Sequence, residues 1–279
     1  MAELEDELGD TVAKARRGLG LTVDQLAERT GLTGHGIEKI ETYRLDPTPE
    51  QVRALAEGLL LDPEKLMSIA ARAWQPAPVD LPQQPALVES IFVPYGAYGE
   101  NCYVLVCAQT HAAAVVDPGG AVDDILAPLD EGGSTLDLVL ITHAHGDHIG
   151  GLRTLESRVR QFRLAAHPAE WRLLGDHPSS RKMAVEDKAT ISLGTLSITA
   201  LHTPGHTLGS MCFQVGGVCF VGDTLFSGSI GRPSGPEVYK QMLASIRQSI
   251  LSLPDQTVLL PGHGPASTAA EEKVHNPFF

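Results

Sequence analysis

The sequence predicts an α+β protein that carries an all-α domain at its N-terminus. In the first 75 residues, apolar side chains recur at the spacing of a helix, as in Leu55–Leu59. Beyond residue 88, short apolar runs of strand length end in loops that carry histidine or aspartate beside glycine. Between these regions lie four prolines, and proline fixes φ and has no backbone N–H to donate. We therefore divide the chain into a helical domain (1–75), a linker (76–87) and a larger domain (88–279).

Capping residues and helix breakers mark the helices of the first domain. Thr22 and Thr33 are placed to cap helices, because a threonine hydroxyl accepts a hydrogen bond from a free N–H of the first turn. Gly31 is placed to end the first of these helices, and Pro47 and Pro49 break the pattern before the next. The expected helices are Val23–Arg29, about Thr33–Thr42, Glu50–Leu60 and a short helix that begins at Asp62–Pro63.

The most informative stretch of the chain is Thr142–His148, which follows the strand-like run Leu138–Ile141. Within six positions it offers four potential metal ligands: His143, His145, Asp147 and His148. A regular helix or strand cannot turn all four toward one metal, whereas a loop at a strand end can curl and bring them together. Imidazole nitrogens and carboxylate oxygens suit zinc, and also iron or manganese.

Three further candidate ligands follow downstream in the same kind of setting. His206, Asp223 and His263 each come after a short apolar run, and each stands beside glycine. Glycine permits a tight turn and the close approach of backbone to a site. Because several strands can end at one edge of a sheet system, we expect all seven groups to gather there.

The order of these motifs resembles the metallo-β-lactamase superfamily. His-x-His-x-Asp-His is followed by Gly-His, Gly-Asp-Thr and Gly-His-Gly. Longer phrases are similar to the glyoxalase II-type thioesterase branch, especially its short members: Asn101–Tyr103, Val116–Gly120, His202–Thr207, Gly222–Phe226, Leu260–Gly264 and Asn276–Phe278. The resemblance covers residues 88–279 and implies an αββα sandwich, in which two mixed sheets pack together with helices outside.

The resemblance also implies a role for each ligand. His143, His145 and His206 would hold a first divalent metal, and Asp147, His148 and His263 a second. Asp223 would bridge both metals, and Asp147 and Asp223 are the expected catalytic residues. We expect zinc, with iron or manganese as alternatives. Arg232 and Tyr98 are the candidate substrate contacts, because a guanidinium pairs well with a carboxylate and Tyr98 lies among glycines in a loop.

The expected function is the hydrolysis of a small acyl-thiol similar to S-lactoylglutathione. Two metals lower the pKa of a shared water enough to give hydroxide near neutral pH, so no side-chain nucleophile is needed. One alternative is a persulfide dioxygenase, which shares the fold but uses one iron. Another is a DNA-binding regulator whose metal domain senses a ligand.

Composition fits an enzyme of a reducing compartment. No uninterrupted apolar run approaches the roughly 20 residues of a membrane span, so no membrane partner is expected. The acidic start Met1–Glu7 lacks the basic region of a signal peptide. The four cysteines show no C-x-x-C spacing and are expected to be buried free thiols, which fits the cytoplasm.

The helical domain resembles the helix-turn-helix domain of the Xre/Cro repressor family, over about residues 8–70. The resemblance rests on Leu19–Leu32 and Ile37–Glu41. It implies a recognition helix whose candidate DNA contacts are Thr33, His35 and Lys39. Two observations weigh against DNA binding: the domain carries nine Lys or Arg against fourteen Asp or Glu, and two glycines occupy the start of that helix.

The alternative reading of this domain is a docking or dimerisation module, which would make the protein a homo-oligomer. Every candidate metal ligand lies beyond residue 142 and across the linker. The sequence alone therefore predicts that the larger domain folds and works without residues 1–75.

Overall fold

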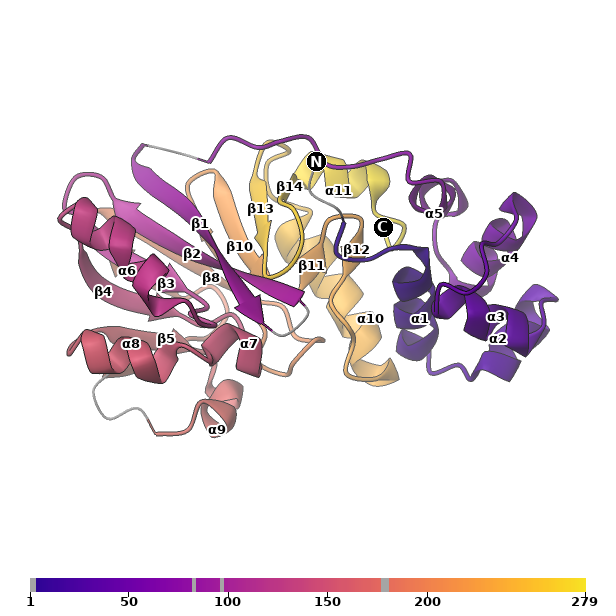
Figure 1. Cartoon of the computed structure of the whole chain (residues 1–279), viewed down its shortest axis with the longest axis horizontal. Helices are drawn as coiled ribbons and strands as arrows, with labels where there is room; N and C mark the ends of the chain where they lie inside the picture. The colour runs from indigo at the N-terminus through magenta and orange to yellow at the C-terminus, as the bar shows by residue number, and fades with distance from the viewer. Residues whose placement is uncertain (1–3, 82–83, 96–97, 177–180) are drawn as a thin grey trace.

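A computed structural model describes residues 4–81, 84–95, 98–176 and 181–279. Five helices form a group at one end of the molecule, and two sheets with their own helices form the rest (Figure 1). The helices of the first group are α1 (Leu8–Gly18), α2 (Val23–Thr30), α3 (Gly34–Glu41), α4 (Pro49–Leu59) and α5 (Pro63–Ala70).

The predicted helix caps are confirmed. The side chain of Thr22 accepts a hydrogen bond from the Gln25 amide, and that of Thr33 accepts one from the Gly36 amide. Gly31 ends α2 in the left-handed conformation, with φ of 72°, which glycine adopts without steric cost. The expected helices are therefore present to within a residue or two, and α1 precedes them.

Two six-stranded sheets make up the larger domain. The first has the order β1-β2-β3-β4-β5-β6 and the second the order β14-β13-β10-β9-β8-β7. The first sheet comprises β1 (Ala86–Tyr95), β2 (Tyr98–Cys107), β3 (Ala112–Val116), β4 (Thr135–Leu140), β5 (Arg163–Ala166) and β6 (Arg181–Ala184). The second comprises β7 (Thr190–Leu193), β8 (Leu196–His202), β9 (Met211–Val215), β10 (Val218–Gly222), β13 (Val258–Pro261) and β14 (Ser267–Thr268). A short hairpin, β11 (Leu225–Phe226) and β12 (Ser229–Ile230), follows β10.

The sheets pack face to face, and helices cover their outer faces. One buried cluster, which includes Leu105, Phe213 and Phe220, lies between the sheets. A second cluster joins the first sheet to its helices. The remaining helices are α6 (Val122–Glu131), α7 (Gly146–Ile149), α8 (Leu152–Arg158), η1 (Pro168–Glu170), α9 (Trp171–Leu174), α10 (Pro236–Ser245), the π-helical turn η2 (Ile246–Ile250) and α11 (Ala269–His275). This arrangement confirms the expected αββα sandwich behind an N-terminal helical domain.

The helical domain and the sandwich share a hydrophobic cluster. Val12 and Leu66 of the helical domain belong to the same buried cluster as Tyr239 and Met242 of α10. The approach of α1 to α10 is close enough to require glycine, because a Cβ on Gly18 would lie 2.6 Å from the Tyr239 ring. The predicted linker separates the two domains along the sequence, but the domains pack against each other through this shared cluster. The first strand, β1, begins at Ala86, which lies inside the predicted linker range of residues 76–87.

None of the helices in the described ranges is long and apolar enough to cross a membrane. The four cysteines are buried free thiols, as the sequence predicted.

Candidate metal centre

Each predicted ligand lies just beyond the end of a strand. The stretch Thr142–His148 follows β4 of the first sheet, and α7 begins within it. His206, Asp223 and His263 follow β8, β10 and β13 of the second sheet. The ends of four strands therefore bring together residues that lie up to 120 positions apart in the sequence.

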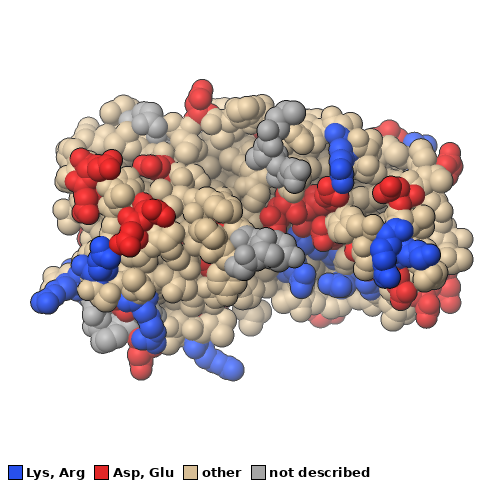
Figure 2. Space-filling model, in the orientation of Figure 1, with Lys and Arg blue, Asp and Glu red and all other residues tan. Residues whose placement is uncertain are grey.

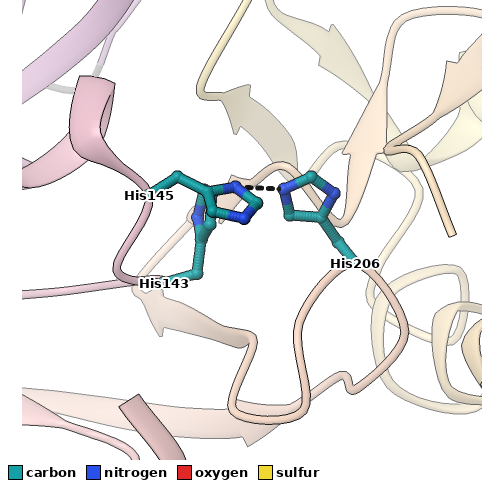
Figure 3. A group of neighbouring side chains, drawn as sticks. All are labelled: His143, His145 and His206. Atoms are coloured by element: carbon teal, nitrogen blue, oxygen red, sulfur yellow. Dashed lines mark hydrogen bonds between the residues drawn. The ribbon is translucent and has the colours of Figure 1, made fainter. Parts of the chain in front are cut away.

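The first group of side chains is His143, His145 and His206, whose ring nitrogens face one another (Figure 3). Nδ1 of His145 lies 3.0 Å from Nε2 of His143 and 2.9 Å from Nε2 of His206. Three imidazole nitrogens at this separation form the kind of donor set that holds zinc or iron.

The second group is Asp147, His148 and His263. Oδ2 of Asp147 lies 3.4 Å from Nε2 of His263 and 4.0 Å from Nε2 of His148. This group contains one carboxylate and two imidazoles, so it is a second potential metal-binding set beside the first.

Asp223 lies between the two groups and turns one oxygen toward each. Its Oδ2 is 3.4 Å from Nε2 of His206, whereas its Oδ1 is 3.3 Å from Nε2 of His148. The carboxylate is the one side chain of the seven whose two donor atoms face different groups. Gly262 leaves room for this arrangement, because a Cβ there would lie 2.6 Å from Oδ1 of Asp223.

Two buried atoms of this site fit a metal better than they fit a hydrogen bond. Nε2 of His148 and Oδ1 of Asp223 are both buried and lie 3.3 Å apart, yet neither forms a hydrogen bond with any of the described residues. Buried polar atoms in proteins are normally paired, because an unpaired one loses its hydration without compensation. A cation bound between these atoms would satisfy both, so the residues present fit a divalent metal.

In three of these histidines, the ring nitrogen that faces away from the other candidate ligands has a fixed partner. Nδ1 of His148 lies 3.0 Å from Oδ2 of Asp117, and Nδ1 of His263 lies 2.7 Å from the Gly99 carbonyl. Nδ1 of His206 lies 3.0 Å from the carbonyl of Arg232. Such partners fix the tautomer and the orientation of a ring that binds metal through its other nitrogen.

The pKa shifts of the histidines differ between the two groups. Burial lowers the pKa of His143 well below its usual value and also lowers that of His206, which favours the neutral imidazole that binds metal. Burial acts in the same direction on His148, but the carboxylates of Asp223 and Asp117 outweigh it and raise its pKa well above normal. Burial opposes ionisation of Asp223, yet the facing histidines, His148 first, hold its pKa well below normal. Asp223 is thus an anion placed between two groups of potential metal ligands.

Two carboxylates outside the seven candidate ligands form hydrogen bonds with the segments that carry those ligands. Asp117, which follows β3, accepts hydrogen bonds from the amide and hydroxyl of Thr142 as well as facing His148. Glu170 accepts one hydrogen bond from the Ala144 amide and one from the Gly209 amide. It thereby joins the segment Thr142–His148 to the loop that carries His206. The phrase Val116–Gly120 was a signal for Asp117, whereas nothing local distinguishes Glu170.

The structure places the other candidate residues as follows. Arg232 is exposed, and its carbonyl is the partner of His206. The expectation that Tyr98 lies in a loop was wrong, because its backbone begins β2 and pairs with Tyr95. The Tyr98 side chain lies outside the described residues. His202 stacks on His167 and does not join either metal-binding group.

The candidate DNA contacts lie on or before α3. The hydroxyl of Thr33 caps that helix, and Lys39 is half-buried. The His35 side chain is 73% exposed, but Glu38 stands on the same surface, 4.0 Å away.

A sequence profile of the metallo-beta-lactamase superfamily matches residues 95–263. The chain belongs to this superfamily. A profile described as a helix-turn-helix domain matches residues 7–67, so this metallo-β-lactamase-fold protein also carries a helix-turn-helix domain.

Relatives of this superfamily member match about two thirds of the chain. An uncharacterized protein of Mycobacterium tuberculosis (strain H37Rv) is 35% identical over 217 residues, which cover 66% of this chain and 95% of the relative. The hydroxyacylglutathione hydrolase GloC of Haemophilus influenzae is 30% identical over 203 residues, which cover 67% of this chain and 95% of the relative.

Solved structures resemble about two thirds of the chain. The BLEG-1 B3 metallo-β-lactamase matches with a TM-score of 0.60 and 32% identity, over 68% of this chain and 99% of that one. A di-iron-bound form of TTHA1623 matches with a TM-score of 0.57 and 30% identity, over 68% of this chain and 100% of that one. ETHE1 from Myxococcus xanthus matches with a TM-score of 0.59 and 28% identity, over 68% and 83%.

Proposed function

We propose that this chain is a metal-dependent hydrolase that cleaves a small thioester, such as S-lactoylglutathione or a related acyl-thiol. The observation that carries the proposal is the place of Asp223, which turns one oxygen toward each of two metal-binding groups. The similarity to a hydroxyacylglutathione hydrolase supports the choice of substrate class.

The proposed ligands are His143, His145 and His206 for one metal, Asp147, His148 and His263 for the other, and Asp223 for both. Two divalent cations held there would supply Lewis acidity toward a carbonyl and would lower the pKa of water. We propose zinc, with iron or manganese as alternatives, because the nitrogen and oxygen donors accept all three.

The side chains of this chain would do the rest by positioning and charge. Asp147 is the more exposed of the two proposed catalytic carboxylates, with 25% of its side chain open to solvent, so we place it beside the entering substrate. Asp223 is 10% exposed and would hold the two metals at a fixed separation. Arg232 and Tyr98 remain the proposed substrate contacts, and exposed Arg232 is suited to a substrate carboxylate.

Metal analysis of the purified protein, combined with a panel of thioester, persulfide, lactone and β-lactam substrates, tests the proposal. We expect two equivalents of divalent metal per chain and turnover of thioesters above the other classes. A single iron with oxygen consumption on persulfides would replace the proposal by the dioxygenase alternative. Turnover of β-lactams alone would also contradict it.

For the helical domain we propose docking rather than sequence-specific DNA binding. On the face shown in Figure 2, acidic and basic side chains interleave over this domain instead of forming a basic stripe. A DNA-binding assay at several salt concentrations tests this, because phosphate contacts strengthen as salt is lowered. Binding that weakens when Lys39 is replaced would favour the regulator alternative, and light scattering would test the proposed homo-oligomer.

We also propose that the protein acts in a reducing compartment such as the cytoplasm. The buried free thiols support this proposal.

A further inference from the structure

The β11–β12 hairpin links two parts of the metal centre. It begins two residues after Asp223, and it ends two residues before Arg232, whose carbonyl holds the His206 ring. A shift of this hairpin would therefore displace the Asp223 carboxylate together with the Arg232 carbonyl that supports the His206 ring.

The C-terminal segment holds the hairpin from one side. The buried carboxylate of Glu272, in α11, accepts a hydrogen bond of 3.1 Å from the Gly228 amide at the hairpin turn. Asn276 donates from Nδ2 to the Ser229 carbonyl at 2.8 Å. These contacts fix the turn and the start of β12.

The helical domain holds the same hairpin from the other side. Lys14 projects from α1, and its Nζ donates to the Ile230 carbonyl at 2.8 Å. The same ammonium group forms an ion pair with Asp6 and lies 4.6 Å from the centroid of the Phe226 ring. As whole residues, Lys14 is 9% exposed and Asp6 is 6% exposed, so the two form a buried charge pair in contact with the hairpin.

The contact continues toward the metal ligands. The Phe226 ring beneath Lys14 is an edge-on neighbour of the His263 ring, at 5.9 Å between centroids. The segment before α1 lies against the same ligand loop, because a Cβ on Gly264 would come within 3.0 Å of the backbone nitrogen of Glu5. The N-terminal segment thus touches the supports of Asp223, His206 and His263.

We infer that Lys14 is a positioning residue for the metal centre, and that the helix-turn-helix domain is a structural part of the hydrolase. A buried lysine is retained only when it is paired and hydrogen-bonded, because its hydration is lost. Here one of the partners of Lys14 is the Ile230 carbonyl of β12, in the hairpin that follows the proposed bridging ligand. The inference rests on the proposed metal site but not on the identity of the substrate.

The test compares three variants of the full-length protein. Lys14→Met removes the contact with the hairpin and also removes the ion-pair partner of the buried Asp6 carboxyl. Lys14→Met/Asp6→Asn removes the contact without leaving a charge behind. Arg16→Met is the matched control: Arg16 pairs with Glu41 at 2.6 Å within the helical domain, and its side chain is 11% exposed, as is that of Lys14.

Two measurements on metal-free protein are needed. The first is the apparent Kd for Co²⁺ and Zn²⁺ by competition with a chromophoric chelator, together with the visible spectrum of the Co²⁺ form. The second is the hydrogen exchange of backbone amides in residues 223–232. We expect both Lys14 variants to weaken metal binding about tenfold, the lower end of the loss seen when an outer support of a ligand is removed. We expect faster exchange in the hairpin and an altered Co²⁺ spectrum in both, whereas Arg16→Met changes neither.

The outcomes separate the inference from the proposed function. If the double variant binds metal with wild-type affinity, or if Arg16→Met loses as much affinity as Lys14→Met, the inference is overturned. The proposed function is judged by the wild-type protein alone, through its metal content and its thioester turnover. Hydrogen exchange of the hairpin requires neither metal nor substrate, so it tests the positioning contact even if the proposed substrate is wrong.

Discussion

The carboxylate of Asp117 lies 3.0 Å from Nδ1 of His148, on the side of the imidazole ring that faces away from the other ligands. Both side chains are fully or almost fully buried, and the same carboxylate also accepts hydrogen bonds from Thr142. Asp117 therefore connects the end of β3 to the segment Thr142–His148 and orients a proposed ligand, without belonging to the proposed set of seven.

Replacement of Asp117 by asparagine should weaken metal binding about 10–100-fold, because the amide no longer enforces the tautomer that exposes Nε2 of His148. Chelator competition on the metal-free protein measures the loss. Asp137→Asn is the control, since Asp137 is a partly exposed residue paired with Arg163. Unchanged affinity in Asp117→Asn would show that the contact does not orient His148.

Replacement of Asp223 by alanine should remove both metals and reduce turnover by more than ~100-fold, the upper end of the loss for an outer support, because it deletes the carboxylate that faces both groups. Elemental analysis and steady-state kinetics measure the two effects. His202→Ala is the control at the end of β8, because His202 stacks on His167 and lies in neither group. An equal loss from both substitutions would contradict the proposed ligand assignment.

The stability of the metal-free protein should depend on Glu272. Burial raises the pKa of this carboxyl to about 7 from 4.5, despite hydrogen bonds from Asn276 and Gly228 that favour its charged form. The folded state therefore binds more protons than the unfolded state between these values. The contribution of the Glu272 carboxyl to the free energy of unfolding is therefore fully present below about pH 4.5, and it is lost as the pH rises through about 7.

Glu272→Gln should remove this slope, because glutamine cannot ionise and can still accept both hydrogen bonds. The difference between pH 5 and pH 8 should be at most about 3 kcal/mol, at 1.36 kcal/mol per pKa unit. Urea unfolding across this range measures it, with Glu57→Gln on the exposed face of α4 as the control for loss of a charge. Parallel curves for wild type and Glu272→Gln would show that Glu272 is ionised throughout.

Substitution of Gly18 by valine should detach the helical domain and destabilise the protein by roughly 1–3 kcal/mol, a typical cost of overpacking. Its Cβ would stand 2.6 Å from the Tyr239 ring, where α1 meets α10. Thermal melting measures the loss, and Gly217→Ala is the control because nothing lies within 4 Å of a Cβ there.

Deletion of residues 1–75 should lower stability further and promote aggregation, because it uncovers the apolar residues of α10 that share a cluster with α1. This expectation differs from the one drawn from the sequence alone, which treated the larger domain as independent. A monomeric truncated chain with wild-type melting temperature and metal affinity would restore the sequence-based view.

The sequence by itself determined the features that depend on local chemistry. Thr22 and Thr33 cap their helices because the hydroxyl and the amide it binds are three residues apart. The strand-like runs before the ligands became β4, β8, β10 and β13, since apolar runs of that length are buried wherever they pair. The candidate ligand motif could be recognised because four potential donor groups fall within six positions.

Only the tertiary structure decided which distant groups support that motif. In the sequence, Lys14 resembles any basic residue of an amphipathic helix. In the structure, its ammonium group donates a hydrogen bond to the Ile230 carbonyl, 216 positions away along the chain. Glu170 and Glu272 likewise act on loops that no local pattern connects to them. The physical reason is that a buried charge is stabilised by whichever polar groups the packed chain brings beside it, and that choice is made by the docking of helices and sheets rather than by spacing along the chain.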